Sequence, residues 1–317
     1  MTSSPRIISL LPSATEIAAA LGFANHLVGR SHECDFPTGV ERLPICSSTK
    51  VPADGTSYEI DERVKEIVAE GLSVYRVEAE RLRELRPDFI LTQTQCAVCA
   101  VTPRDLEQAL CAWTGAQPAI ISLEPNNLDD VWNDVRRVGE ALGAPDRAEK
   151  LIDSLTQRLA AIRDKAQMAQ SRPGVGAIEW LGPLMAGGNW MPELIEIAGG
   201  RSLFAKAGEH SSWLEWATLI EADPEVILLL PCGFEIAQTI RDLNLLTENP
   251  AWANLRAVKE GRVYAIDGHH FFNRPGPRLV ESAEIVAEIL HPDRFSFGHR
   301  GTGWIPISEA NASATKQ

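Results

Sequence analysis

Short apolar runs separated by amphipathic segments predict a chain of alternating strands and helices. Four runs in the first part of the chain are typical of buried parallel strands: residues 6–11, 27–29, 89–91 and 119–123. Charged segments with apolar residues at helical spacing predict helices at residues 59–71, 78–85 and 103–113. Strands that alternate with helices in this way predict an α/β fold.

The middle of the chain is predicted to be helical. From residue 128 to about residue 169, apolar residues recur at helical spacing and no strand-like run interrupts them. A break is expected at residues 143–145, where the sequence reads Gly-Ala-Pro. We expect this segment to form a long helical spine.

The second half of the chain repeats the alternation. Strands are predicted at residues 175–180, 226–230 and 262–266, and helices at residues 191–198, 213–222, 234–245, 251–258 and 278–290. Residues 85–91 resemble residues 222–228, because in each a helix ends before a Pro-acid pair and a strand follows. This internal similarity predicts two similar αβ lobes. Beyond residue 295 the chain turns polar, and we expect disorder from about residue 308.

The predicted architecture is α/β: two Rossmann-like αβ lobes joined by a long helical spine, with a ligand cleft between the lobes. An N-terminal lobe, the spine, a C-terminal lobe and a partly disordered tail are expected at residues 1–125, 126–170, 171–294 and 295–317. Ligands of open α/β sheets bind at the carboxyl ends of the strands. Binding residues are therefore expected in the loops that follow the strands.

Composition and charge limit the classes of partner and the cellular location that we expect. The formal net charge of −13 argues against nucleic acid or an anionic membrane surface as the main partner. No apolar run of about 18 residues predicts a membrane span. We see no signal peptide, and the six cysteines do not resemble a disulfide framework. We therefore expect a cytoplasmic protein, with a periplasmic location as the alternative if an export signal has been removed.

Two loops of the N-terminal lobe carry residues that suit soft metals. Cys34 follows one predicted strand and is flanked by His32 and Glu33, while Cys96 and Cys99 form a CxxC motif after another strand. Thiolate and imidazole ligands suit zinc, an iron–sulfur centre or a cobalt centre. A redox-active dithiol and simple packing of buried cysteines are the alternatives.

The C-terminal lobe carries further candidates on its own loops: Glu179, Trp180, Asn189, Trp190, His269, His270 and Arg274. Either histidine could be an axial ligand to a metal or a solvated loop residue. The guanidinium of Arg274 could pair with an anionic ligand group or cap the loop. Trp180 and Trp190 bracket a glycine-rich loop and offer faces for stacking on a macrocycle.

Motifs of common enzyme classes do not occur in the sequence. There is no GxGxxG or GxxxxGK[ST] pattern, which argues against a dinucleotide site or a P-loop. There is also no HExxH or GxSxG pattern. We therefore expect a binding protein rather than an enzyme.

Several motifs resemble those of a known family. They are RIISLLPSATE at residues 6–16, LRPD at residues 85–88, the long central helix, IAGG at residues 197–200 and EADPE at residues 221–225. Together they resemble the helical-backbone class of ABC-transporter substrate-binding proteins, which includes vitamin B12 and iron-siderophore binders. The resemblance covers about residues 6–290 and implies the class III periplasmic-binding-protein fold.

A narrower resemblance concerns the ligand. The motifs HECDFP at residues 32–37, QCAVCA at residues 95–100 and NRPGPR at residues 273–278 are similar to those of the branch usually called cobalamin-binding proteins. The branch implies a corrinoid ligand and adds Gln95 to the candidate binding residues. The positions that flank the corrin in the transporter protein correspond to Glu33 and about Val74 in the first lobe.

The resemblance also implies a membrane partner. In exported members, one glutamate of each lobe docks on an ABC permease. Glu80 corresponds to the first of these glutamates by its distance from the LRPD motif. The second position falls near Ala217, and Glu215 lies two residues away.

The favoured hypothesis is a soluble substrate-binding protein for cobalamin or a related metal-bearing macrocycle. The alternative is a cytoplasmic metalloprotein or redox protein with zinc or an iron–sulfur centre in the Cys/His site. A third hypothesis is an ordinary transporter component that reaches its permease by unconventional export.

Overall fold

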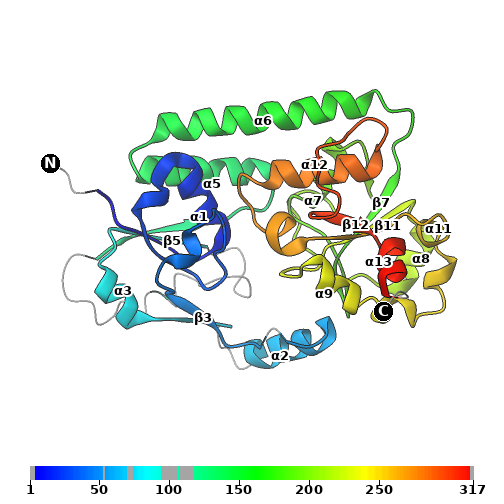
Figure 1. Ribbon diagram of the computed structural model, residues 1–317, viewed down its shortest axis with the longest axis horizontal. Helices are drawn as coiled ribbons and strands as arrows, with labels where there is room; N and C mark the ends of the chain where they lie inside the picture. Colours follow the sequence, from blue (N-terminus) through cyan, green and yellow to red (C-terminus); the bar gives the residue numbers. More distant parts are fainter. Residues whose placement is uncertain (1–3, 53, 70–73, 94–105, 107–116, 315–317) are drawn as a thin grey trace. The chain divides into compact units, whose positions relative to one another are not determined.

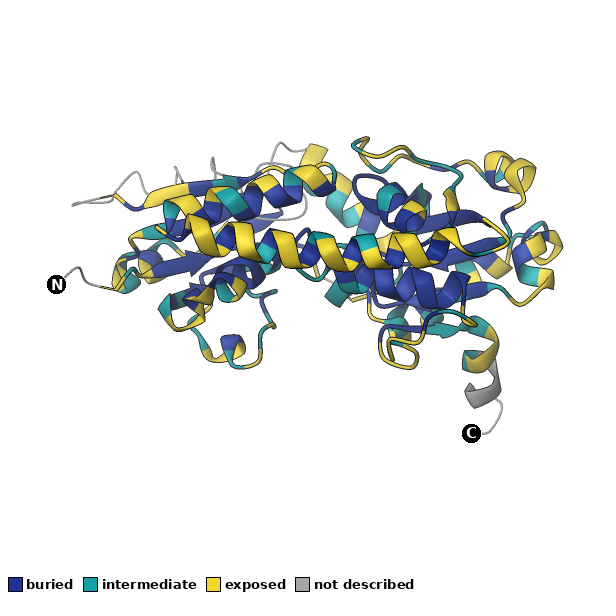
Figure 2. Cartoon of the chain, turned by 90° about the horizontal axis from the view of Figure 1, so that it is seen from above, coloured by how far each residue is buried: buried dark blue, intermediate teal, exposed yellow. Residues whose placement is uncertain are grey.

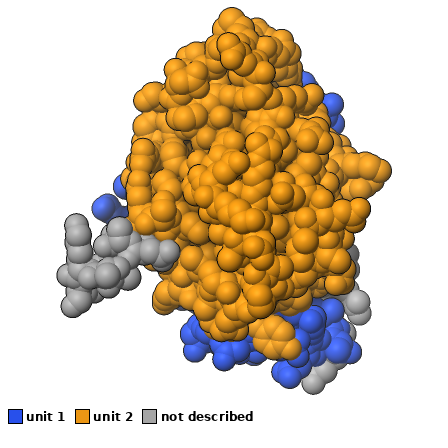
Figure 3. All heavy atoms as spheres, turned by 90° about the vertical axis from the view of Figure 1, so that its right-hand side faces the viewer, with its two compact units in different colours: residues 1–55, 59–125, 129–154 blue, residues 56–58, 126–128, 155–317 orange. Residues whose placement is uncertain are grey.

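Two apolar cores divide the chain into two units. The structure is a computed structural model, and it describes residues 4–52, 54–69, 74–93, 106 and 117–314. Unit 1 contains residues 1–55, 59–125 and 129–154 (Figure 3). Unit 2 contains residues 56–58, 126–128 and 155–317.

Unit 1 is built on a parallel sheet with the strand order β2-β1-β5-β6. Its strand β5 is labelled in Figure 1. Its strands are β1 (Ile7–Ser9), β2 (Leu27–Arg30), β5 (Phe89–Gln93) and β6 (Ala119–Leu123). All neighbouring strands in this sheet run parallel, as their buried apolar sequences predict. The carboxyl ends of β2 and β5 therefore lie at the same edge of the sheet.

Helices and a small hairpin complete the described part of unit 1. The helical segments are α1 (Pro12–Ala18), η1 (Ala19–Phe23), η2 (Ala24–His26), η3 (Val40–Arg42), α2 (Ser57–Ala69), whose first two residues are assigned to unit 2, and α3 (Ala79–Leu85). Helix α1 packs on β1 and β5, and α3 packs on β2. Strands β3 (Ser47–Thr49) and β4 (Tyr75–Val77) pair antiparallel. Leu82 of α3 is fully buried with Ile8 and Ile90 of the sheet.

The predicted helical spine consists of two helices, α5 (Leu128–Ala141) and α6 (Pro145–Gln167). The break falls at the predicted Gly-Ala-Pro, where Gly143 has a φ of +70°, a value that favours glycine. Exposed residues follow one face of α6 along its length (Figure 2). No helix among the residues that the structure describes is long and apolar enough to cross a bilayer.

Unit 2 contains a mixed sheet with the strand order β12-β11-β10-β7-β8, and β9 pairs with β7. Its strands are β7 (Gly174–Leu181), β8 (Leu184–Ala186), β9 (Arg201–Ser202), β10 (Val226–Leu229), β11 (Val263–Ile266) and β12 (Trp304–Pro306). Strands β7, β10 and β11 run parallel, whereas β8 and β12 are antiparallel to their neighbours. Every residue of β10 is buried, as expected for a central parallel strand.

Helices cover both faces of this sheet. They are α7 (Met191–Ile197), α8 (Trp216–Ala222), α9 (Ile236–Arg241), α10 (Asn244–Thr247), η4 (Trp252–Asn254), α11 (Arg256–Lys259), η5 (Gly268–Phe272), α12 (Leu279–Leu290) and α13 (Ile307–Ala314). On one face, Leu219 of α8 packs in a cluster with Ile227 of β10. On the other face, Val175 of β7 lies near Ile195 of α7 and Leu290 of α12.

The segment that we expected to be a polar, partly disordered tail is instead part of unit 2. The carboxylate of Glu288 in α12 accepts backbone hydrogen bonds from Phe297, Gly298 (2.6 Å) and His299 (3.2 Å). The indole nitrogen of Trp304 also donates to this carboxylate (2.9 Å). These contacts anchor the polar segment on α12, and β12 then pairs with β11.

The predicted internal similarity extends to the backbone. Arg86 and Asp223 directly follow helices α3 and α8 and have φ values of +44° and +39°, and a proline follows each. In both cases the residue after the proline is an acid that accepts a hydrogen bond from a backbone N–H at the start of the unit's first strand. Asp88 accepts from Arg6 N (2.8 Å). Glu225 accepts from Gly174 N (3.0 Å).

Candidate functional site

Three parallel strands of unit 2, β7, β10 and β11, end at the same edge of its sheet. Glu179 and Trp180 lie in the last part of β7, and His269, His270 and Arg274 follow β11. Backbone hydrogen bonds join the segments at this edge: Cys232 N donates to Glu179 O (3.1 Å), and His269 N donates to Phe234 O (3.0 Å). The sheet therefore brings Glu179, Trp180 and the histidines to one edge, where the strand topology predicts a ligand.

Trp180 and Phe234 form an aromatic pair at this edge. Their ring centroids lie 5.2 Å apart and the rings are tilted by 59°. Trp180 is half-buried, whereas Phe234 is buried. The Nε1 atom of Trp180 is buried and has no hydrogen-bond partner among the residues that the structure describes. A half-exposed indole on a fixed aromatic support is suited to stacking against a flat ligand.

The two histidines lie in the short helix η5, and each has a different polar neighbour. The Nδ1 atom of His270 lies 2.7 Å from Oδ2 of Asp267. The Nε2 atom of His269 lies 3.0 Å from a guanidinium nitrogen of Arg274, which is 4% exposed. The two imidazole rings meet edge to face with centroids 4.6 Å apart. Arg274 is thus a buried partner of the histidine loop.

Glu179 and Asn189 belong to a second set of contacts. Ser211 Oγ donates to Glu179 Oε2 (2.9 Å) and accepts from Gly188 N (3.1 Å). Asn189 N donates to Glu209 O (2.7 Å), and Asn189 has a φ of +52°. The Oδ1 atom of Asn189 is buried, and no described residue forms a hydrogen bond with it. These bonds fasten the glycine-rich loop to the segment around residue 210.

Trp190 lies in the interior of unit 2. It is 6% exposed, and its Nε1 atom donates to Phe272 O (2.8 Å). Its indole therefore supports the histidine helix from within and offers little face to a ligand. Of the two tryptophans that the sequence singled out, Trp180 is the more exposed.

In unit 1, His32 and Glu33 follow β2 and contact Tyr75 of β4. Tyr75 donates to Glu33 Oε1 (3.0 Å), and its ring lies 5.5 Å from the His32 ring. Ser47 Oγ lies 3.0 Å from His32 Nδ1. Burial lowers the pKa of His32, while the charge of Glu33 acts in the opposite direction and that of Arg30 adds to the shift. A neutral imidazole is therefore favoured near neutral pH.

The cysteines do not all lie where a ligand would reach them. Cys34 is 1% exposed, and Thr15 Oγ1 lies 3.1 Å from its sulfur. Cys46 is fully buried, and burial raises its pKa to about 11, so it remains a thiol. Gln95, Cys96 and Cys99 lie outside the described residues. Their role as ligands stays a prediction.

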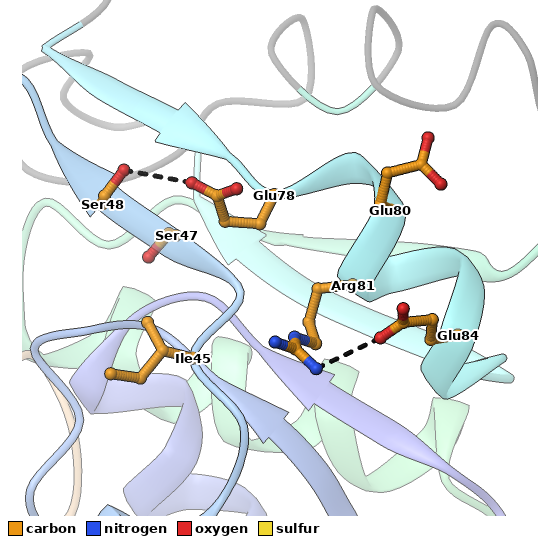
Figure 4. A pocket seen from close by; sticks show the side chains of 7 residues that line it. All are labelled: Ile45, Ser47, Ser48, Glu78, Glu80, Arg81 and Glu84. Carbon is orange, nitrogen blue, oxygen red and sulfur yellow. Dashed lines mark hydrogen bonds and ion pairs between the residues drawn. The ribbon is translucent and has the colours of Figure 1, made fainter.

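The predicted docking glutamate Glu80 lines a surface pocket of about 370 Å³ on unit 1 (Figure 4). It is exposed near the start of α3 and pairs with Arg83. The other lining residues come from β3, α3 and the segments before them: Ile45, Ser47, Ser48, Glu78, Arg81 and Glu84. In unit 2, Glu215 is exposed directly before α8, and Ala217 is exposed within it.

Three neighbours of the candidate residues were not predicted from the sequence: Tyr75, Phe234 and Asp267. Tyr75 and Phe234 carried no signal, because their contacts depend on how separate strands pair. Asp267 carried a weak one, since an aspartate directly before a short helix commonly caps it. The structure shows this cap: Asp267 Oδ1 accepts from His270 N (2.8 Å).

The sequence matches a family model described as "Periplasmic binding protein" over residues 7–269. The chain belongs to the periplasmic binding protein family. The predicted class III fold of this family is confirmed, and the solved structures below share it.

Relatives cover nearly the whole chain. An uncharacterised ABC transporter substrate-binding lipoprotein, YvrC of Bacillus subtilis, is 23% identical over 296 residues (92% of this chain and 81% of YvrC). A vitamin B12-binding protein of Vibrio cholerae is 26% identical over 293 residues (90% of this chain and 88% of the relative).

Solved structures with the same fold include binders of different ligands. The apo form of the periplasmic heme-binding protein RhuT from Roseiflexus superimposes with a TM-score of 0.68 at 24% identity, covering 92% of this chain and 99% of RhuT. The periplasmic vitamin B12-binding protein BtuF of Vibrio cholerae gives a TM-score of 0.63 at 22% identity, covering 90% and 96%. These identities establish a shared fold only.

The relatives correct the predicted location of the protein and bear on two other predictions, the absence of enzyme activity and the alternative metal site. The expected cytoplasmic location is wrong, because the family consists of periplasmic binding proteins and one relative is a lipoprotein of an ABC transporter. The family and its B12-binding relatives are substrate-binding proteins, which is consistent with the expectation that the chain is not an enzyme. The names of these relatives and solved structures give no support to the zinc or iron–sulfur alternative.

Proposed function

We propose that this protein is the substrate-binding component of an ABC importer and that its substrate is a metal-bearing macrocycle, with a corrinoid as the first candidate. The observation that carries the proposal is the group of aromatic and imidazole side chains at the carboxyl ends of the parallel strands of unit 2. A half-exposed Trp180 rests on Phe234, and the backbone of Phe234 accepts from His269. A flat apolar surface beside nitrogen donors suits a macrocycle with a central metal.

The relatives favour a corrinoid over other macrocycles. Several of them are named vitamin B12-binding proteins. Heme is the second candidate, because heme-binding proteins are among the solved structures of the same fold, one of them in complex with two hemes. The histidine pair could serve either ligand, since both cobalt and iron accept imidazole nitrogen.

Two parallel titrations test the proposal. Aquocobalamin and heme are each added to the purified protein, and binding is followed by the visible spectrum and by isothermal calorimetry. We expect saturation at one ligand per chain, with the corrinoid bound at least tenfold more tightly. Tighter binding of heme would reverse the order of the two candidates. Absence of binding by both ligands would overturn the proposal.

We further propose that Glu80 contacts the permease. Its carboxylate is exposed at the rim of the pocket on α3, where a cationic residue of a partner could reach it. With the permease in proteoliposomes, Glu80→Arg is expected to reduce stimulation of its ATPase about tenfold or more without changing ligand affinity, because reversing a charge at an interface introduces repulsion. Glu84→Arg is the matched control on the same helix. Equal effects of the two variants would contradict a specific role for Glu80.

A further inference from the structure

The side chain of His299 contacts two helices, α12 and the short helix η5 that carries His269 and His270. Its Nε2 atom lies 3.0 Å from Oε2 of Glu284 in α12. Its ring meets the ring of Phe271 in η5 at a centroid distance of 6.0 Å and an angle of 72°. The pair with Glu284 is largely buried, because 18% of the His299 side chain and 11% of the Glu284 side chain are exposed. One imidazole therefore links α12 to η5.

The backbone of His299 is connected to η5 by a second route. Gly303 N donates to His299 O (2.7 Å), and Gly303 O accepts from Asp267 N (2.9 Å). Asp267 caps η5, because its Oδ1 atom accepts from His270 N (2.8 Å). A shift of His299 would therefore act on η5 through the ring of Phe271 and through this cap.

The charged form of His299 is favoured by the carboxylates of α12. The hydrogen bond to Glu284 raises the pKa of His299, and burial opposes this rise. The negative charges of three glutamates raise it further: Glu284, Glu288 and Glu281. Arg158 of α6 balances part of this charge, because it donates to the second oxygen of Glu284 (2.7 Å).

Loss of the proton would weaken the ion pair of His299 without releasing the backbone of its segment. A charge-assisted hydrogen bond is about twice as strong as a neutral one. Because the folded-state pKa is raised, the stabilisation is complete below pH 6.5 and is lost as pH rises through the raised value. Glu288 accepts from the backbone of residues 297–299 in either state. From η5 the neighbour is the uncharged ring of Phe271, and the guanidinium carbon of Arg278 lies 5.4 Å from the centroid of that ring.

We propose that His299 is a pH-dependent support of η5, so that the protein binds its ligand more tightly when this imidazole is charged. This inference rests on the proposed function, because η5 carries the histidines of the candidate site. The charged ring is fixed by its ion pair with Glu284 and supports Phe271, whereas the neutral ring is held less firmly. Binding and protonation are linked, so the ligand in turn favours the charged form of His299.

Hydrogen exchange of the ligand-free protein tests the support of η5 independently of any ligand. The amides of His269 and His270 donate to Phe234 O and to Asp267, and their protection is measured at pH 6 and pH 9 after correction for the intrinsic exchange rate. We expect protection in the parent protein to fall by about fivefold or more at pH 9, which is the low end of couplings between sites. The His299→Gln side chain can still donate a hydrogen bond but does not titrate, so its protection should stay the same at both pH values. Equal changes in the parent protein and the variant would overturn the support of η5 by His299.

Binding of aquocobalamin at the same two pH values tests the effect on affinity. Titration of the probe and of His269 and His270 is common to all the proteins, so the comparison isolates His299. From pH 6 to pH 9, we expect Kd to rise about fivefold more in the parent protein than in His299→Gln. His210→Gln removes an exposed histidine of unit 2 and is the matched control, which should behave like the parent protein. The same rise in the parent protein and in His299→Gln would overturn the effect on the ligand.

The two measurements separate this inference from the proposed function. A loss of protection that depends on His299, with no binding of aquocobalamin or heme at either pH, would overturn the proposed function and leave the support of η5 standing. Binding of aquocobalamin with protection that does not depend on His299 would overturn the support of η5 and leave the proposed function standing.

Discussion

The Glu288→Gln substitution is expected to release the C-terminal segment of unit 2. One oxygen of Glu288 accepts from Phe297 N and Gly298 N, and the other accepts from His299 N and from the buried indole of Trp304. A glutamine keeps one accepting oxygen, so two of the four donors would face its NH2 group. Each hydrogen bond to a charged group contributes about 1.5–3 kcal/mol, which predicts a loss of about 3–6 kcal/mol.

Hydrogen exchange of the amides of residues 297–299 measures this loss directly. A change of 1.4 kcal/mol is tenfold in an equilibrium constant, so about 3 kcal/mol corresponds to a decrease in protection of roughly 100-fold. Glu281→Gln is the matched control on the same helix. Burial raises the pKa of Glu281, with Arg278 and Arg158 opposing, so burial disfavours its charged form.

Two results would refute the reasoning. Protection within threefold of the parent protein in Glu288→Gln would show that the carboxylate does not anchor the segment. An equal loss in Glu281→Gln would show that the effect belongs to the helix rather than to the four donors. The variant also reports on function, because Gly303 of this segment accepts the hydrogen bond from Asp267 N.

Three further predictions concern stability. Burial raises the pKa of the Asp134 carboxyl group from its ordinary value of 3.8 to about 7. The folded protein therefore loses stability as pH rises from 3.8 to about 7, because the buried group becomes charged. Asp134→Asn should raise the urea midpoint of unit 1 at pH 8 but not at pH 4. Although burial opposes it, hydrogen bonds from His299 and Arg158 lower the pKa of Glu284, and the bond to Glu284 raises that of His299. Unit 2 should therefore be most stable between pH 4.5 and pH 6.5, which are the ordinary pKa values of the two groups. When urea midpoints are measured at a series of pH values, His299→Ala should remove the fall in the midpoint above pH 6.5. A Cβ on Gly188 would lie 2.5 Å from the backbone nitrogen of Ser211, so Gly188→Ala should destabilise unit 2 by about 1–3 kcal/mol in urea; an unchanged midpoint would contradict this packing.

The sequence pattern was sufficient to predict the strands, because each is a short, continuous apolar run between polar segments. β6 (Ala119–Leu123) matches the predicted residues, and β10 is buried on both faces as its composition implies. The two-lobe expectation rested on a Pro-acid repeat, and the structure gives that repeat a shared backbone geometry at Arg86 and Asp223. Local signals of this kind depend on residues close together in the chain.

Contacts between distant residues could not be predicted in the same way. Residues beyond 295 are polar, so periodicity indicated a tail, although one carboxylate in α12 satisfies their amides. Trp190 follows a glycine-rich loop, yet its indole nitrogen is bonded to Phe272, 82 residues away. A one-dimensional pattern shows that a side chain is aromatic or charged, but not which partner the fold will supply.

The same distinction bears on how ligand selectivity would arise. The aromatic pair Trp180 and Phe234 would accept many flat ligands, because stacking depends on area rather than on the identity of the metal. The histidine helix would add a chemical requirement, because an imidazole such as that of His270, which Asp267 orients, favours a ligand whose metal accepts nitrogen. Asp267 is itself fastened to the C-terminal segment that Glu288 anchors. Selectivity for the metal would thus depend on residues that never touch the ligand. A substitution that weakens the contacts of Glu288 should reduce this selectivity before it abolishes ligand binding.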